Sequence, residues 1–200
     1  MDNNALFKIG YGLYVVTTNT GEKDNGCILN TTMQVTSNPV QIAIAVNKNN
    51  YTEEIIKTTN KFNICVLAEG TKFDVFKRFG FQCGRDINKF EGFNDVQRAK
   101  NGLLYLTKNT NAYLSASVDN IIELGSHTMF IAKVDDAEIL SDTPTVTYDF
   151  YQKNIKPKPQ KVEKHGWRCK TCGYIYEGDE LPSDFICPWC KHGVDDFERI

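Results

Sequence analysis

Near its end the chain reads Cys169-Lys170-Thr171-Cys172 and then, after fourteen further residues, Cys187-Pro188-Trp189-Cys190. A CxxC turn places both sulfurs on one side of a tight loop. Two such loops facing each other supply four ligands to a tetrahedral zinc or iron site. Chance rarely places two such pairs in so short a window. The spacing therefore predicts that Cys169, Cys172, Cys187 and Cys190 bind one metal ion.

The residues beside the cysteines favour iron over zinc. Trp167, Tyr174, Phe185 and Phe197 are spaced to pack a small apolar core over the metal. A dry aromatic shell and backbone N–H groups directed at the sulfurs tune a redox site, whereas a structural zinc does not require them. Gly173 suits the positive φ that follows a metal knuckle. A structural zinc ribbon remains the alternative on spacing alone.

Residues 167–198 resemble a rubredoxin, the one-iron, four-cysteine electron carrier. The patterns WxCxxCGYxY, LPxDFxCPxC and DxFE follow one another in order. The segment between the cysteine pairs is shorter than in free-standing rubredoxins and closer to the rubredoxin domains of rubrerythrins. Lys191 stands where a glycine usually follows the fourth cysteine. Neither departure removes a ligand, so the resemblance implies one Fe(Cys)4 centre.

Length and composition limit the classes of protein. Two hundred residues accommodate one medium domain and one small domain, and the small one needs its metal to fold. A net charge of −2, with both signs interspersed, gives no basis for nucleic-acid binding. We find no stretch long enough to span a membrane and no secretory signal, so we expect a cytoplasmic protein. Cys27, Cys65 and Cys83 are then expected to be free thiols.

The first 150 residues read mostly as strands, which favours a closed antiparallel barrel. Asn50 followed by Glu53 predicts a capped helix start, and a second short helix is expected over residues 71–79, with Thr71 as its cap and Gly80 just past its end. Strands are expected over residues 11–18, 27–36, 41–46, 62–67, 103–106, 111–124, 128–139 and 146–148.

The boundary between the two domains is marked by composition. Residues 153–164 contain two prolines, five lysines and little apolar content. Extended, such a segment reaches roughly 40 Å at about 3.1 Å per residue. The sequence therefore predicts a barrel over residues 1–152, a Lys/Pro linker over 153–164 and the small metal domain over 165–200.

A one-electron iron centre needs a source of single electrons. A flavin takes up two electrons as hydride and releases them singly. Residues 30–36 form an unusually polar strand, whose hydroxyl and amide groups suit flavin ring edges. Lys48 and the start of the following helix suit a phosphate dianion. An ordinary Thr-rich strand beside an ordinary capped helix is the alternative.

Residues 5–150 resemble the flavin reductase family of FMN-binding split barrels. The residues that carry this resemblance are Gly26 to Thr36, Pro39, Asn47-Lys48 and Tyr51-Thr52. Gly125-Ser126-His127 is similar to a later Gly-Asp-His signature of that family, with Ser126 in place of the acid. The resemblance implies a role for His127 near the flavin or nicotinamide. It also implies FMN contacts among residues of the polar strand and the helix start: Asn30, Thr31, Thr32, Gln34, Val35, Thr36, Asn47, Lys48, Tyr51 and Thr52.

The order of the two domains resembles the high-molecular-weight rubredoxins of anaerobes. That resemblance implies a mainly β fold: an FMN-binding split β-barrel with short helices, followed by a rubredoxin-like iron-knuckle domain. It implies an NAD(P)H:rubredoxin oxidoreductase that passes electrons from NADH or NADPH through FMN to iron. The implied acceptor is a flavodiiron-type protein that reduces nitric oxide or oxygen. Members of the flavin reductase family dimerise, so a homodimer is expected.

Two other functions remain open from the sequence. One is a binding module, with a zinc ribbon attached to a ligand-binding or regulatory barrel. The other is a flavin or ferric reductase in which the metal domain is secondary. Zinc has a filled d shell and is colourless, whereas ferric thiolate is strongly coloured, so a visible spectrum separates the first alternative from the iron protein.

Overall fold

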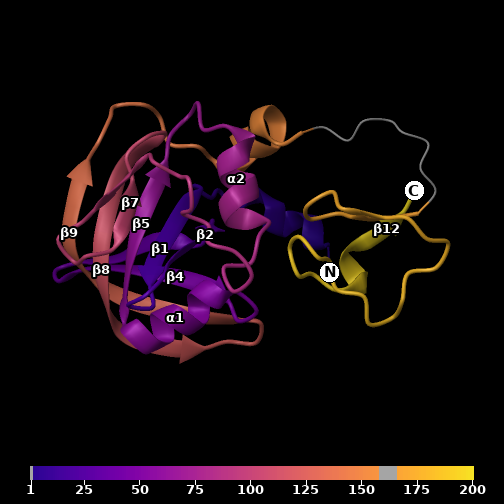
Figure 1. Ribbon diagram of the computed structural model, residues 1–200, viewed down its shortest axis with the longest axis horizontal. Coiled ribbons are helices and arrows are strands. Elements are labelled where there is room, and N and C mark those ends of the chain that lie inside the picture. The colour runs from indigo at the N-terminus through magenta and orange to yellow at the C-terminus, as the bar shows by residue number, and fades with distance from the viewer. Residues whose placement is uncertain (1, 158–165) are drawn as a thin grey trace.

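The computed structural model describes residues 2–157 and 166–200. A β-barrel with short helices precedes a small unit that lies beside it (Figure 1). The elements are η1 Asn3–Lys8, β1 Tyr14–Asn19, β2 Asp24–Leu29, β3 Thr32–Ser37, β4 Val40–Asn47, α1 Tyr51–Thr59, β5 Lys61–Leu67, α2 Phe73–Gly80, β6 Val96–Arg98, β7 Leu104–Leu106, β8 Thr110–Glu123, β9 His127–Ile139, α3 Tyr148–Phe150, η2 Tyr151–Ile155, β10 Trp167–Cys169, β11 Ile175–Tyr176, η3 Val194–Asp196 and β12 Phe197–Arg199.

The barrel is built on one seven-stranded sheet in the order β2-β1-β5-β8-β9-β4-β3, with every neighbouring pair antiparallel. Its inner face is filled by β-branched and aromatic side chains, including Val16, Ile44, Phe62, Ile64 and Phe130, each fully buried. These residue types favour strands because their branched or flat side chains pack well on a pleated surface. The mainly β fold predicted from the sequence is therefore confirmed.

The expected strand over residues 27–36 is wrong, because the chain breaks at Asn30 and Thr31 into β2 and β3. These two strands lie at opposite edges of the sheet. Two residues span at most about 11 Å between Leu29 and Thr32, so the sheet must curl until its edges meet there. Thr31 holds the junction to β4, since its hydroxyl donates to the Ala45 carbonyl at 2.7 Å. The barrel is split at this seam.

The first long helix follows the predicted cap, whereas the second does not. The Asn50 side chain accepts the Thr52 N–H at 3.2 Å at the start of α1. The helix α2 begins at Phe73 after Lys72, and Thr71 instead donates its hydroxyl to the Ala68 carbonyl at 2.6 Å. Gly80 is the last residue of α2 rather than the residue beyond it.

The end of the barrel domain is helical rather than extended. The strand expected over residues 146–148 is wrong. Residues Tyr148–Phe150 form α3, capped by the Thr147 hydroxyl, and η2 continues to Ile155. Tyr151 is buried against Phe76, with ring centroids 4.5 Å apart. Residues 158–164 of the predicted linker lie outside the described residues. The domain limits drawn from the sequence stay a prediction.

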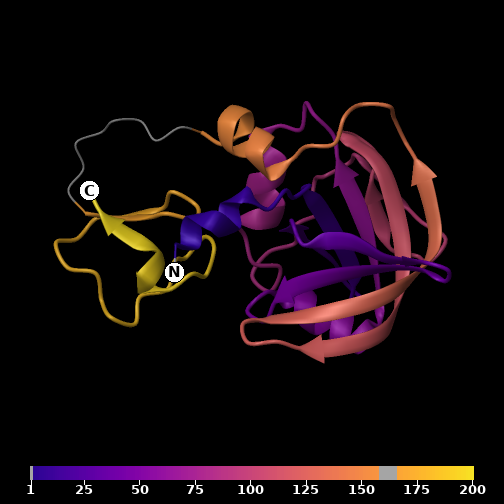
Figure 2. The ribbon, with the colours of Figure 1, turned by 180° about the vertical axis from the view of Figure 1, so that it is seen from behind.

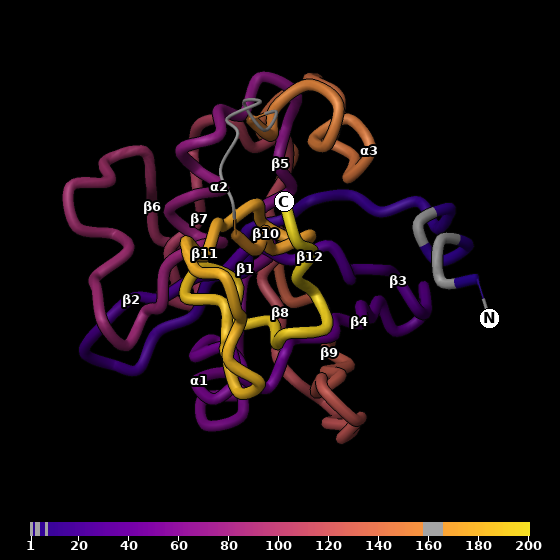
Figure 3. The backbone as a smooth tube through the Cα atoms, turned by 90° about the vertical axis from the view of Figure 1, so that its right-hand side faces the viewer, coloured from indigo at the N-terminus to yellow at the C-terminus, as the bar shows by residue number. Residues whose placement is uncertain are grey.

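The small unit is a three-stranded sheet in the order β11-β10-β12 with its loops. Seen from behind, η1 lies on the near side of the molecule (Figure 2). When the right-hand side of Figure 1 is turned toward the viewer, the small unit lies in front of the barrel, over β1 and β8 (Figure 3). Among residues 2–157 and 166–200, no helix is long and apolar enough to cross a membrane.

Candidate functional site

The four cysteines are held by two knuckles of matching geometry. The Gly173 N–H donates to the Cys169 carbonyl at 2.8 Å, and the Lys191 N–H donates to the Cys187 carbonyl at 2.9 Å. Each turn is closed by a residue with positive φ, +82° at Gly173 and +62° at Lys191. The expectation of a positive φ at Gly173 is confirmed. At Lys191 a β-carbon-bearing residue adopts the conformation that glycine favours.

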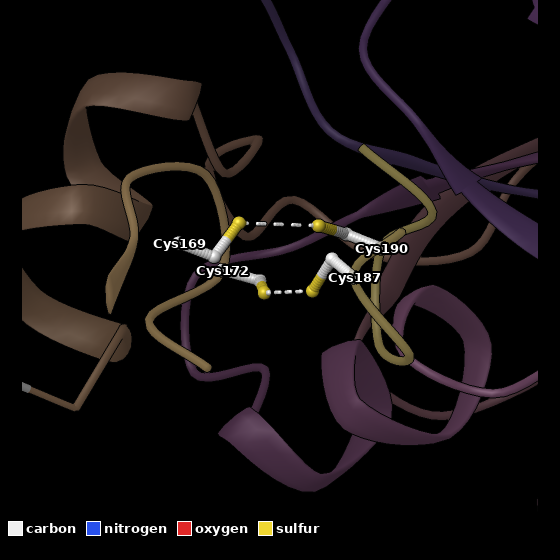
Figure 4. A group of neighbouring side chains, drawn as sticks. All are labelled: Cys169, Cys172, Cys187 and Cys190. Carbon is white, nitrogen blue, oxygen red and sulfur yellow. Dashed lines mark hydrogen bonds between the residues drawn. The ribbon is translucent and has the colours of Figure 1, made fainter. Parts of the chain in front are cut away.

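The four sulfurs converge on one point (Figure 4). Cys169 and Cys190 Sγ lie 3.5 Å apart, Cys172 and Cys187 Sγ lie 3.4 Å apart, and all four lie within 4.8 Å of one another. A tetrahedron with metal–sulfur bonds of about 2.3 Å has sulfur–sulfur edges of about 3.8 Å. The site therefore fits one four-coordinate metal ion, without bridging disulfides among the described residues.

An aromatic shell surrounds the cysteines as the sequence predicted. Phe197 is buried, and Trp167, Tyr174 and Phe185 pack around the same cluster. The Phe185 and Phe197 rings meet edge to face at 5.4 Å. The shell also receives Phe81, a residue of the barrel domain. A dry shell of this kind lowers the local dielectric constant around a redox metal.

Hydrogen bonds to sulfur favour the thiolate form at the first ligand. Hydrogen bonds with the Cys172 and Cys190 side chains, and then with the backbone N–H groups of Cys172 and Thr171, lower the pKa of Cys169. Backbone N–H groups of Tyr174 and His192 also donate to Cys172 and Cys190. Thiolates are the metal ligands, and donors to sulfur are the groups that tune an iron–sulfur potential.

A cavity of about 380 Å³ lies where the barrel splits. Its barrel side is lined at the seam by Asn30 and Thr31, at the end of β4 by Asn47, and at the start of α1 by Asn50 and Tyr51. Apolar walls come from Ile28, Leu29, Phe79, Phe81 and Tyr148. Apolar walls with a few amide and hydroxyl groups are what a planar aromatic cofactor needs, so the residues present fit a flavin.

Four of the ten residues singled out for FMN line this cavity: Asn30, Thr31, Asn47 and Tyr51. Thr32, Gln34, Val35 and Thr36 lie along the edge strand β3 instead, with Val35 46% exposed. The polar residues 30–36, which the sequence presented as one strand, are thus divided between the seam and an outer edge strand.

The other two predicted residues engage neighbouring side chains. The Thr52 hydroxyl is buried and accepts the Asn25 amide N–H at 2.8 Å. Lys48 forms an ion pair with Glu123 at 2.9 Å. Glu123 also pairs with Lys57 at 2.7 Å, and hydrogen bonds from Lys57 and then Lys48 lower its pKa to about 2. Lys48 thus stands beside the start of α1 with an acid as its partner.

His127 lies at the start of β9 and lines the cavity. Its Nδ1 is 2.8 Å from the hydroxyl of Ser126, the residue that replaces an acid in the resembled signature. Burial, followed by the charge of His192, lowers the pKa of His127. A neutral imidazole donates a hydrogen bond from one ring nitrogen and accepts one at the other.

The sequence suggested Gly84-Arg85-Asp86, in the loop after α2, as a lid or nicotinamide contact, with a solvated turn as the alternative, but it did not point to the loop residues or the residues of the small unit that line the cavity. Gln82, Cys83 and Lys89 line it, and so do Trp189 and Cys190. Lys89 is buried, and its ammonium donates to the Gly26 carbonyl at 2.9 Å and the Phe79 carbonyl at 3.1 Å. No local pattern marks these residues, because the loop has no periodicity and the knuckle lies more than a hundred residues away.

Two family models match the chain in sequence. The flavin reductase like domain matches residues 6–157, and the rubrerythrin, rubredoxin-like domain matches residues 167–198. The first match covers most of the chain and includes every residue on the barrel side of the cavity. The second covers all four cysteines.

Two curated proteins are similar to the chain over most of their lengths. A "High molecular weight rubredoxin" of Moorella thermoacetica is 35% identical, with all of both chains covered. A "Ferric-chelate reductase (NAD(P)H)" of Archaeoglobus fulgidus is 37% identical, covering 81% of this chain and 95% of that protein.

Among solved structures, the Streptomyces globisporus NADH:FAD oxidoreductase SgcE6 superposes with a TM-score of 0.66 at 20% identity, covering 72% of this chain and 84% of that one. At this identity the likeness concerns the fold. The barrel therefore has the architecture of solved flavin-dependent oxidoreductases.

Proposed function

Because the chain belongs to the flavin reductase-like family and is a homologue of high molecular weight rubredoxin over its whole length, we propose that it passes electrons from NAD(P)H through FMN to one rubredoxin-type iron. The chain is an oxidoreductase with a flavin reductase domain and a rubredoxin-like cysteine cluster, which support a flavin and an iron as its cofactors. The observation that carries the proposal is the shared cavity, which the barrel and Cys190 line together.

The barrel residues have defined tasks in this proposal. The amide and hydroxyl groups of Asn30, Thr31 and Asn47 bond the flavin ring, and Tyr51 and the start of α1 face its ribityl phosphate. Lys48 adds positive charge near that phosphate. His127 lies within the cavity as a neutral hydrogen-bonding group toward flavin or nicotinamide. The bound flavin supplies the conversion of a hydride into single electrons.

The iron domain is suited to an external protein acceptor, which we propose is of the flavodiiron type. Residues 165–200 carry seven acids and four Lys/Arg residues. Asp179, Glu180, Asp184 and Asp195 are exposed. An acidic face favours a partner with a basic docking surface, and contacts of this kind are screened within about 10 Å at 0.1 M salt. Partner reduction is expected to be faster at low ionic strength.

A homodimer in the cytoplasm completes the proposal. The β3–β4 hairpin exposes Met33, Val35 and Val40 at 57%, 46% and 46%. A cluster of exposed apolar residues beside the seam is suited to a second copy. Cys27, Cys65 and Cys83, which lie outside the metal cluster, form no disulfide among the described residues. Sedimentation of the flavin-loaded protein tests the dimer.

Truncation tests the route. A chain ending at Glu163 keeps the whole of the flavin reductase like match, residues 6–157, and lacks the rubredoxin-like match. It is expected to oxidise NADH or NADPH with free flavin or an artificial dye as acceptor. It is expected to fail to reduce a flavodiiron partner at a useful rate. Equal partner reduction by the truncated and full chains would refute the passage of electrons through iron.

A second candidate function is reduction of ferric chelates by the barrel itself. The ferric-chelate reductase activity of the Archaeoglobus relative favours it. The same truncated chain distinguishes the two candidates. If the truncated chain still reduces ferric chelates at the full rate, chelate reduction belongs to the flavin. If the same chain no longer reduces the protein partner, partner reduction belongs to the iron domain.

A further inference from the structure

The second cysteine knuckle contacts the barrel through two stacked rings. The Trp189 and Phe81 rings lie 6.1 Å apart at an interplanar angle of 11°. Phe81 is the C-cap residue of α2 and also packs against Phe73 at 5.7 Å. On its other side Trp189 meets Tyr174 edge to face at 5.4 Å. A row of aromatic rings therefore runs from α2 into the shell of the metal site.

The same knuckle covers the cavity proposed for flavin. Trp189, Cys190, Lys191 and His192 line it opposite the seam residues Asn30 and Thr31. Cys190 is partly exposed, while Cys169 and Cys187 are fully buried and Cys172 is 6% exposed. Of the four ligands, Cys190 is the one that lines the cavity. Cys190 would therefore be the iron ligand nearest to a flavin held in this cavity.

The cavity beneath the knuckle has the volume of a single small-ligand site. About 380 Å³ lies near the lower end of the range for one small-ligand site. Hydride transfer needs the nicotinamide carbon within about 3.5 Å of the flavin ring. The knuckle occupies the space that faces the barrel side of the cavity, where a stacked nicotinamide would have to lie.

Among the described residues, the ring stack joins the second knuckle to the barrel domain, and a hydrogen bond joins the first knuckle to it: the Lys156 ammonium donates to the Thr171 carbonyl at 3.0 Å. Trp189 keeps 45% of its surface exposed in the docked position. Stacked aromatic rings contribute about 0.5–1.5 kcal/mol beyond the area they bury. Such a contact holds the second knuckle in one position over the cavity, and it is still weak enough for the knuckle to move away during turnover.

On the basis of the proposed function, we infer that Trp189 on Phe81 is the docking contact that brings Cys190 to the flavin, and that docking and nicotinamide binding exclude each other. Oxidation of one NAD(P)H yields NAD(P)+, one proton and two electrons. Each electron reduces one ferric centre to ferrous, so two docking events, or two iron domains, take up the pair. Trp189 and Phe81 are positioning residues in this scheme.

The test uses the full chain loaded with flavin and iron. Flash photoreduction of the flavin, with a sacrificial donor and no nicotinamide, is followed by flavin and ferric absorption. Trp189→Ala and Phe81→Ala are expected to slow iron reduction at least about tenfold, since small misplacement of reacting groups has large effects on rate. Trp189→Phe retains a ring and is expected to restore most of the rate.

A matched control is Ile186→Ala. Ile186 is an apolar residue of the same domain, 59% exposed and absent from the cavity lining. Its iron reduction rate is expected to stay within about twofold of the parent, as for surface substitutions away from a defined contact. The ferric spectrum of each variant confirms that its iron domain is folded. Unchanged iron reduction in both Trp189→Ala and Phe81→Ala would overturn the docking contact.

Mixing the same proteins with NADH or NADPH tests whether the docked knuckle and a bound nicotinamide exclude each other. Because a loosened knuckle competes less with nicotinamide, KM for nicotinamide is expected to fall in Trp189→Ala while iron reduction slows. A merely structural defect would not move these two quantities in opposite senses. An unchanged or raised KM would refute exclusion. Failure of the parent protein to oxidise nicotinamide would refute the proposed donor, and the flash experiment would still decide the docking contact.

Discussion

Lys191 takes the place in the second knuckle that Gly173 takes in the first. Both have positive φ, +62° and +82°, and both N–H groups donate to the carbonyl of the first cysteine of their knuckle. An L-residue in this left-handed region costs roughly 1–2 kcal/mol. The second knuckle therefore holds its shape against a local conformational preference, which metal coordination and the Lys191–Cys187 hydrogen bond offset.

Relieving this strain is expected to stabilise the iron domain. Lys191→Gly removes the φ penalty but increases the freedom of the unfolded chain, which offsets about 0.4–1 kcal/mol. The net gain is expected to be about 0.5–1 kcal/mol. Gly173→Ala is expected to lose about 1 kcal/mol. A β-carbon there meets no atom within 4 Å, so the loss arises from φ alone. Denaturant unfolding followed by ferric absorption measures both, and shifts of the same sign would contradict this account.

Loss of one ligand is expected to unfold the small domain. Cys187 is fully buried, and Cys187→Ser replaces a thiolate with a poor ligand for iron. Since metal binding and folding are coupled, iron content and the near-ultraviolet signal of the aromatic shell should be lost together. Exhaustive chelation of the parent protein should give the same result. Cys83→Ser, outside the cluster, is the control and should retain its iron; retention of iron by Cys187→Ser would exclude Cys187 as a ligand.

The flavin phosphate is expected to depend on one of two neighbouring lysines. Lys48 and Lys57 both pair with Glu123, at 2.9 and 2.7 Å. Lys48→Glu places negative charge next to the start of α1 and should weaken FMN binding steeply at low salt and less at high salt. Lys57→Glu is the control, because it also breaks an ion pair with Glu123 but lies in the last turn of α1, away from the helix start. Fluorescence titration with FMN compares them, and equal affinities would place the phosphate elsewhere.

The ion pairs of Glu123 with Lys48 and Lys57 are expected to stabilise the folded state above about pH 4 but not in strong acid. Lys57 and then Lys48 lower its pKa to about 2, from about 4.3 in an unfolded chain. A depressed folded-state pKa gives stability that is present above the unfolded value and lost as pH falls toward the folded one. The difference in unfolding free energy between the parent and Glu123→Gln should therefore shrink between about pH 5 and pH 2. A difference that is constant over this range would refute the assignment.

The metal site was predictable because its determinants are local. Cys169 and Cys172 lie on one turn, Gly173 supplies the turn's positive φ, and aromatic residues within thirty positions supply the shell. The cap of α1 at Asn50 is local in the same way. Spacing and side-chain chemistry are sufficient wherever the partners of a residue are its near neighbours in the chain.

The remaining features depend on partners that are distant in sequence. Asn30 and Thr31 interrupt a run of strand-forming residues without glycine or proline, so no turn signal marks the break between β2 and β3. The stack of Trp189 on Phe81 joins a knuckle to a loop that has no periodic pattern. Thr71 looks like a helix cap by type, but its hydroxyl also lies 3.1 Å from the carbonyl of Asn109, a distant residue in the chain.

The seam at Asn30 and Thr31 also makes the cavity depend on the whole sheet. Chain neighbours there belong to the two outermost strands, so the barrel is complete only when β1, β5, β8, β9 and β4 are all paired between them. Those pairings join distant segments, such as Ile44 with Phe130, and non-local pairing of this kind is slow. The cavity is therefore complete only in the folded barrel. A flavin that binds there recognises only completed barrels, so its binding energy adds directly to the stability of the native state.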